Sequence, residues 1–213
     1  MKLPNRRNVF STTFEDPLKY YFLPLLGTIF RKRLEMGLQL LGKGPFSHVL
    51  EIGYGSGILF PELKDRCRTI VGVDNHRRPE LVKEMMARER IEASLAVGDI
   101  LHLSFPQDTF DAVICLSVLE HIRDISGAVG EIVRVLKPGG RAILGFPTTH
   151  KATNAMLTLI GAPCIDKRHI SNHRKIREEV KQQMALIDER WFPALIPQDY
   201  SLYIALHAAK EKR

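Results

Sequence analysis

The stretch "VLEIGYGSGILFPEL", residues 49–63, decides how this chain folds. Its apolar run ends in Gly53, Gly55 and Gly57, at every second position, and Glu51 stands two residues before the first glycine. Glycines at a strand-to-helix turn adopt backbone angles that other residues resist, and they let a ligand approach the main chain closely. A carboxylate beside such a loop suits a cationic ligand better than a phosphate. The stretch therefore predicts a ligand loop that receives a positively charged group.

Short apolar runs alternate with amphipathic segments on both sides of this loop. We expect strands at 48–53, 69–74, 93–100, 110–117 and 141–147, and helices at 57–67, 78–91 and 125–137, the last closed by the turn at 138–140. Alternation of this kind predicts a parallel sheet covered by helices on both faces. Such sheets bind ligands beyond the carboxyl ends of their strands, where the strand order reverses.

Two acids directly follow expected strands. Asp74 could accept both hydroxyls of a ribose, or it could cap the following helix. Asp99 could accept a hydrogen bond from the exocyclic amine of adenine, with Ile100 packing on the ring, or it could belong to a Gly-Asp turn. A dinucleotide loop needs a third glycine where this chain has Ile58, so no pyrophosphate site is expected. These residues together describe an adenosine that carries a cationic group.

At this point the chain resembles the class I S-adenosylmethionine-dependent methyltransferases, in the broad group that includes ubiquinone- and menaquinone-biosynthesis enzymes. The resemblance covers roughly residues 46–147 and rests on five segments in the same order and spacing. These segments are "VLEIGYGSG" (49–57), "VGVD" (71–74), "VGDI" (97–100), "FDAVICLSVLEHI" (110–122) and "EIVRVLKPGGRAILGFP" (131–147). The resemblance implies a Rossmann-like, doubly wound α/β fold, with a mostly parallel seven-stranded sheet and an antiparallel C-terminal strand. We expect "ALIDERWFPALIPQ" and "YSLYIALHAAK" to form the antiparallel pair.

The resemblance also assigns site residues. It places the methionine part of S-adenosylmethionine against Glu51 and the loop of Gly53, Tyr54, Gly55 and Gly57, the ribose against Asp74 and Asn75, the adenine against Asp99 and Ile100, and the sulfonium near Cys115 and Leu116. Tyr54 replaces a residue that is usually small, and it could narrow the pocket or point outward. His121 could abstract a proton from the acceptor, or it could only position the cofactor. Its neighbour Glu120 is expected to be solvated.

The cysteines, the histidines and the net charge indicate which compartment and which ligands to expect. Cys67, Cys115 and Cys164 lie far apart without a CxxC pair, which predicts a reducing, cytoplasmic location and no zinc site. His150, His169 and His173 have no supporting carboxylate pattern, so we expect no bound metal. The net charge of +7 is too diffuse for a nucleic-acid stripe. The chain also has no Asn/Asp-Pro-Pro-aromatic stretch for a flipped base.

The N-terminal part differs from the rest. Residues 1–45 hold a basic, apolar and aromatic segment without a signal peptide, and we expect a helical cap on the methyltransferase domain at 46–213. The apolar run at 18–30 is too short to span a bilayer, but residues 18–33 could contact a membrane surface through Arg31, Lys32 and Arg33. Residues 10–36, with aromatics that include Phe14, are expected to form a mobile lid over the acceptor.

The sequence thus predicts methyl transfer from S-adenosylmethionine to a small-molecule or lipid-like acceptor. Two alternatives stay open. The chain could bind S-adenosylmethionine without catalysis, or it could be a nicotinamide-dependent oxidoreductase, which the missing third glycine disfavours.

Overall fold

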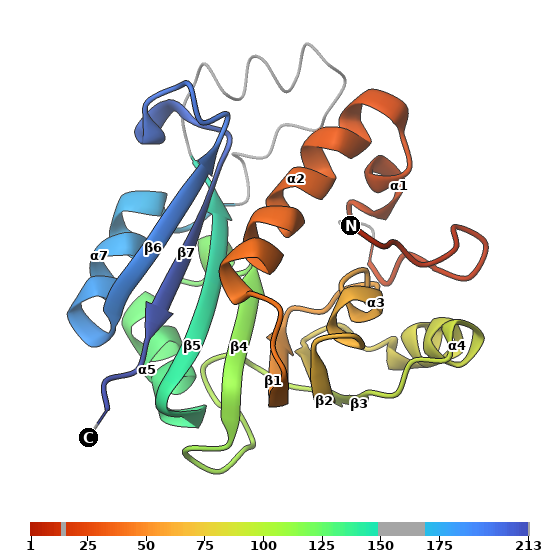
Figure 1. Cartoon of the computed structure of the whole chain (residues 1–213), viewed down its shortest axis with the longest axis horizontal. Coiled ribbons are helices and arrows are strands. Elements are labelled where there is room, and N and C mark those ends of the chain that lie inside the picture. The colour runs from red at the N-terminus through yellow and green to blue at the C-terminus, as the bar shows by residue number, and fades with distance from the viewer. Residues whose placement is uncertain (14–15, 149–168, 213) are drawn as a thin grey trace.

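The structure is a computed structural model, and it describes residues 1–13, 16–148 and 169–212. Phe14, His150 and Cys164 lie outside these ranges, so the expectations that involve them concern residues that are not described. Figure 1 shows one central twisted sheet with helices packed on both of its faces.

Seven strands form a single sheet in the order β3-β2-β1-β4-β5-β7-β6. Their bounds are β1 Phe46–Ile52, β2 Cys67–Asp74, β3 Ser94–Val97, β4 Phe110–Leu116, β5 Leu136–Pro147, β6 Ala185–Phe192 and β7 Tyr203–Ala209. The pairs among β1 to β5 are parallel, and β7 runs antiparallel to both β5 and β6. The predicted Rossmann-like sheet with an antiparallel C-terminal strand is therefore confirmed.

The helices follow the expected alternation. Their bounds are α1 Leu18–Tyr21, α2 Pro24–Leu41, α3 Phe60–Leu63, α4 Pro79–Glu89, α5 Ile125–Val135 and α7 His173–Gln183, with short 3-10 turns η1 Leu119–His121 and η3 Gln198–Tyr200. Asn172 caps α7 by accepting a hydrogen bond from the Lys175 amide.

Alternate residues of β4 serve two separate cores. Ala112 and Ile114 pack in the core that includes α2, α3 and α4, whereas Val113 and Cys115 pack in the core that includes α5 and α7. Successive strand residues point to opposite faces, so a nearly continuous apolar run is what a strand covered on both sides requires. Figure 1 shows these two helical layers on either side of the sheet.

The strand order reverses at β1, which lies between β2 and β4. The chain passes from β1 to β2 on one side, and it reaches β4 on the other side only after β3. The loops that follow β1 and β4 therefore leave the sheet in opposite directions and open a crevice between them. The glycine loop and the segment that contains His121 are those two loops.

Two local predictions were wrong. The expected helix at 57–67 is reduced to α3, because the chain still turns from Gly55 to Leu59 and both Gly55 and Gly57 have positive φ. The turn at 138–140 was expected to close the helix before it. It lies instead within β5, where the register of the pairing with β4 shifts. Gly139, with φ of 74°, permits that irregularity.

The N-terminal helices pack on the domain. Phe30, Leu34 and Leu38 of α2 are buried in the same core as the sheet residues. The Arg33 guanidinium points inward to Tyr21 and Ser117, so the expectation that it faces lipid headgroups was wrong. In the described part of the chain no helix has both the length and the apolar character needed to cross a bilayer. Lid movement of residues 10–36 stays a prediction.

Candidate functional site

A cavity of about 280 Å³ opens at the carboxyl ends of β1 and β4. Its walls come from segments far apart in the sequence: α1 and α2, the glycine loop, the turn η1, and the loop between β6 and β7. Among the predicted site residues, the lining includes Glu51, Gly53, Tyr54, Gly55, Leu116 and His121. The cavity therefore joins the expected cofactor loop to the expected catalytic histidine.

The three glycines of the loop have different reasons to be glycine. All have positive φ: 76° at Gly53, 50° at Gly55 and 73° at Gly57. A Cβ on Gly53 would lie 2.2 Å from Val118, and a Cβ on Gly57 would lie 2.8 Å from Met85. A Cβ on Gly55 would meet nothing within 4 Å. Packing thus requires glycine at 53 and 57, whereas Gly55 faces open space that a ligand can occupy.

Glu51 is buried without a hydrogen-bond partner for Oε2 in the described part of the chain. Only 4% of its surface is exposed, and it lines the cavity. Burial, and then the charge of Asp74, raise the pKa of this carboxyl well above its usual range. An unpaired buried acid in a cavity is suited to a cationic group, such as the ammonium of a methionine moiety.

Asp74 binds the glycine loop from the end of β2. Its Oδ2 accepts a hydrogen bond from the Gly55 amide (2.7 Å), and its Oδ1 accepts one from the His76 amide (3.1 Å). The residue at the start of α4 is Arg78, and no side chain caps that helix. The helix-cap interpretation of Asp74 was therefore wrong.

Tyr54 does not point outward. It is 2% exposed, and its ring lies 6.0 Å from the Phe60 ring and 4.9 Å from the His76 ring. Its hydroxyl is buried without a hydrogen-bond partner in the described residues. Burial raises the pKa of this phenol to about 12. Tyr54 therefore occupies space beside the loop, which agrees with the alternative that its side chain narrows the pocket.

The remaining predicted cofactor residues lie outside the cavity lining. They are Gly57, Asp74, Asn75, Asp99, Ile100 and Cys115. Asp99 accepts a hydrogen bond from the Leu101 amide (3.0 Å), which is turn geometry. Ile100 and Cys115 are buried in the core beneath α5, and burial strongly raises the pKa of the Cys115 thiol. Their assignment to the adenine and the sulfonium stays a prediction.

Glu120 is buried, so the prediction that it is solvated was wrong. It is 2% exposed, because the Ile170 and Ser171 amides donate to its main-chain oxygen and bring the segment before α7 against it. Burial raises the pKa of its carboxyl to about 8. Its neighbour His121 has a side chain that is 45% exposed, with Nε2 4.0 Å from Glu120 Oε1.

Glu120 and His121 also lie close to His169. One ligand atom from each of the three residues lies within 4.8 Å of the others, a spacing that a shared metal ion could bridge. The expectation of no metal considered only the histidines at 150, 169 and 173. The sequence offered no signal for this grouping, because 48 positions separate His121 from His169.

Arg33 and Ser117 are cavity residues that sequence reasoning missed. Arg33 Nη2 donates to Tyr21 Oη (2.6 Å), and its Nη1 lies 3.4 Å from Ser117 Oγ. Ser117 also contacts Tyr203 Oη at 3.0 Å. Its φ of 62° is unusual for a residue other than glycine, and such backbone strain gathers at functional sites. No motif signals this network, because its members are brought together only by the fold.

Comparison with known proteins shows that this chain is similar to methyltransferases. Residues 50–144 match the protein family described as "Methyltransferase domain". Over 123 residues the chain is 33% identical to a ubiquinone biosynthesis O-methyltransferase of Pseudomonas entomophila. The matched segment covers 56% of this chain and 52% of that protein. The chain thus spans about half the length of the curated relatives it matches.

Solved structures share the fold at lower identity. The N-methyltransferase NodS of Bradyrhizobium japonicum, in complex with S-adenosylhomocysteine, aligns with a TM-score of 0.66 and 19% identity over 94% of each chain. The cyclase SpnF aligns with a TM-score of 0.71 and 16% identity, over 90% of this chain and 84% of its own. At these identities the likeness shows the fold alone, because one fold serves several chemistries.

Proposed function

We infer that this chain, whose residues 50–144 match the family described as "Methyltransferase domain", transfers a methyl group from S-adenosylmethionine to a small-molecule acceptor. One observation carries the inference: Glu51, the open face of Gly55 and His121 all line one cavity where the strand order reverses. Cofactor loop and candidate base thus share one site, as a group transfer between two bound molecules requires.

The residues present fit S-adenosylmethionine. The unpaired carboxyl of Glu51 offers an acceptor for its ammonium, and the empty space at Gly55 offers room for its chain. Asp74, held beside that loop, offers a carboxylate to the ribose hydroxyls. When bound, this cosubstrate supplies a methyl group already activated on a sulfonium. The protein itself must then mainly orient the acceptor and exclude water.

We propose oxygen as the methylated atom. The relatives that match over 123 residues are named O-methyltransferases, and a hydroxyl nucleophile benefits from a base that takes its proton. His121 is accessible from the cavity and can accept that proton as the oxygen–carbon bond forms. Aromatic and aliphatic walls, which include Phe30, Leu116 and Phe192, favour an apolar acceptor.

We place this reaction in the cytoplasm. Cys67 and Cys115 are both free thiols in the structure, which agrees with a reducing compartment.

Two measurements test the proposal. Calorimetry should show binding of S-adenosylhomocysteine and none of NAD, and methyl-labelled S-adenosylmethionine should label a phenolic probe such as catechol or a component of a cell extract. NAD binding would contradict the proposal in favour of an oxidoreductase. Tight S-adenosylhomocysteine binding without transfer to any component of the extract would favour a binding protein that lacks catalysis.

A further inference from the structure

We propose that His76 is a positioning residue for the cofactor. Its ring holds the main chain of Gly55 in the shape that receives the methionine part of S-adenosylmethionine. The inference rests on the proposed function in naming that ligand. His76 belongs to none of the motifs that the sequence offers for the cofactor, although it stands two positions after Asp74.

The hydrogen bonds of the His76 ring show where its hydrogen lies. The Arg78 amide donates to Nδ1, with 3.1 Å between the two atoms, so Nδ1 carries no hydrogen. A neutral imidazole with a free Nδ1 has its hydrogen on Nε2. That nitrogen lies 3.0 Å from the main-chain oxygen of Gly55, which can only accept. The ring therefore donates a hydrogen bond to the middle glycine of the loop, 21 positions earlier in the chain.

Gly55 depends on hydrogen bonds for its conformation. A Cβ at this position would meet nothing within 4 Å, so no side-chain packing selects one backbone shape. Its φ of 50° is only one of the values that glycine adopts readily. Asp74 Oδ2 accepts from its amide at 2.7 Å, and His76 donates to its oxygen. In the described part of the chain no backbone amide donates to that oxygen. The residues that follow β2 thus hold both polar groups of Gly55.

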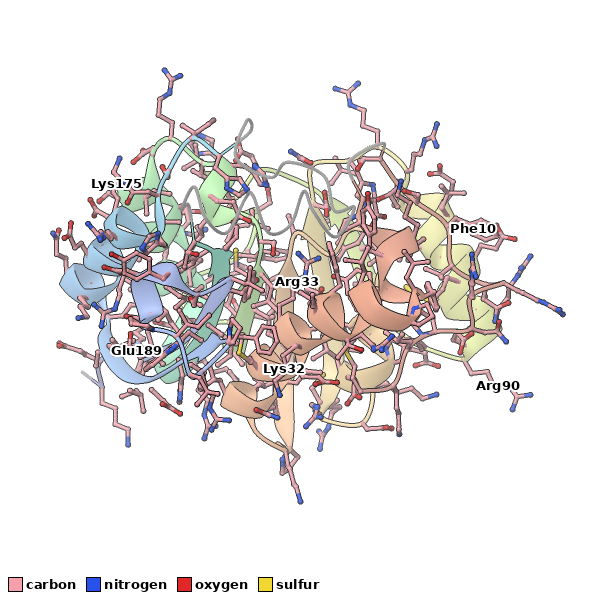
Figure 2. All side chains as sticks on the ribbon, turned by 90° about the horizontal axis from the view of Figure 1, so that it is seen from above. Phe10, Lys32, Arg33, Arg90, Lys175 and Glu189 are labelled. Atoms are coloured by element: carbon pink, nitrogen blue, oxygen red, sulfur yellow. The ribbon has the colours of Figure 1, made fainter. Side chains whose placement is uncertain are left out.

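The segment that carries the His76 ring is itself firmly held. The residue is 6% exposed, and its ring packs edge-on against the Tyr54 ring, with 4.9 Å between the ring centres. β2, which precedes it, lies between β1 and β3 in the sheet. α4, which follows it, packs in the core through residues that include Val82 and Met85. Figure 2 shows α4 along one side of the molecule, with Arg90 at its end. The ring can therefore hold Gly55 without moving itself.

Holding Gly55 before the ligand arrives lowers the cost of binding. A loop that already has its bound shape loses little conformational freedom when the ligand enters. Without the ring, the Gly55 oxygen loses its donor, and the flexible glycine peptide is free to rotate. A rotated peptide would turn a polar oxygen into the cavity that also holds Glu51, where the ligand is expected. Loss of this one bond should therefore weaken cofactor affinity while the sheet stays intact.

Two variants that differ by one methylene separate the two bonds of the ring. His76→Gln keeps an amide hydrogen at the level of Nε2 and can donate to Gly55. His76→Asn keeps an acceptor at the level of Nδ1 and can serve only the Arg78 amide. In calorimetry, S-adenosylhomocysteine affinity should stay within about threefold of wild type for His76→Gln and fall about tenfold or more for His76→Asn. His48→Asn, at an exposed position outside the cavity lining, is the control and should not change affinity.

Three further measurements separate positioning from a general loss of structure. Nitrogen NMR of the His76 ring should show the Nε2-protonated form in the unliganded protein. Amide hydrogen exchange at Gly55 should be faster in His76→Asn than in His76→Gln, because only the second variant restrains that peptide. In a transfer assay His76→Asn should raise KM for S-adenosylmethionine and leave kcat unchanged. Circular dichroism checks that each variant is folded.

Several outcomes would overturn the proposal. Equal affinity of the two variants for S-adenosylhomocysteine would do so, and so would an Nδ1-protonated ring in the wild type. Wild-type affinity in His76→Asn beside weak binding in His76→Gln would assign the ring to the turn at Arg78 instead. If the wild type does not bind S-adenosylhomocysteine at all, the proposed function fails. Exchange at Gly55 that depends on His76 would then leave the ring a role in loop structure alone.

Discussion

Asp74 Oδ2 accepts a hydrogen bond from the Gly55 amide, with 2.7 Å between the two atoms. The carboxylate at the end of β2 and the middle glycine of the loop after β1 are therefore one structural unit. An acid expected to bind the ribose or to cap a helix instead holds the loop that would receive the methionine moiety. Changes at either residue should consequently affect both the ligand and the loop.

Asp74→Ala should weaken S-adenosylhomocysteine affinity at least tenfold, because two charge-assisted hydrogen bonds to the ribose would each contribute about 1.5–3 kcal/mol. Loss of the bond to Gly55 should also lower the free energy of unfolding by about 1 kcal/mol. Calorimetry and urea unfolding measure the two effects. Unchanged affinity with a lower stability would leave Asp74 a purely structural role.

Gly55→Ala should abolish or strongly weaken S-adenosylhomocysteine binding while the fold survives. The new methyl group meets no protein atom within 4 Å, and the left-handed backbone costs about 1–2 kcal/mol. Gly57→Ala is the matched control, because its methyl group would clash with Met85 at 2.8 Å and destabilise the protein more. Normal cofactor affinity in Gly55→Ala would show that the ligand does not occupy that space.

His121→Asn should lower kcat about 100- to 10,000-fold if the side chain is the general base. Its partial exposure predicts little change in stability, and S-adenosylhomocysteine affinity should stay within about twofold. His102→Asn is the control, because His102 is exposed and outside the cavity lining. A His121 variant with normal kcat but weaker cofactor binding would assign the residue to positioning.

Glu120 should make the protein less stable as the pH rises. Burial raises the pKa of its carboxyl from 4.5 to about 8, so between these values the unfolded chain loses the proton that the folded chain keeps. The free energy of unfolding should then fall by up to about 1.4 kcal/mol per pH unit in that window. Glu120→Gln should flatten this dependence in thermal unfolding, whereas Glu178→Gln, at an exposed position, should not. Parallel pH profiles for wild type and Glu120→Gln would refute the assignment.

Lid movement of the N-terminal segment should be visible by hydrogen exchange. Amides of residues 18–23 should exchange faster than those of 37–41, which lie outside the predicted lid in the part of α2 that is packed in the core. Ligand binding should slow exchange in the first group. Equal, slow exchange in both groups would make the segment a fixed wall of the cavity.

The sequence by itself determined the sheet and the end of the cavity at the glycine loop. Apolar runs separated by amphipathic segments encode parallel strands and their covering helices. Glycines and acids at strand ends mark the ligand edge, because those residue types are needed at that place whatever surrounds them. Glu51 and Gly55 were accordingly predicted, and they line the cavity.

Only the tertiary structure decided the end of the cavity that holds Arg33 and Glu120. The inward direction of Arg33 depends on Ser117, 84 positions away, and on Tyr21 at the end of α1, 12 positions away. The burial of Glu120 depends on the segment at Ile170 and Ser171. A charged residue has no periodic pattern that reveals which neighbours the fold will bring to it. Local sequence encodes backbone geometry, but the environment of a side chain, and hence its charge and its ligand, depends on contacts between distant segments.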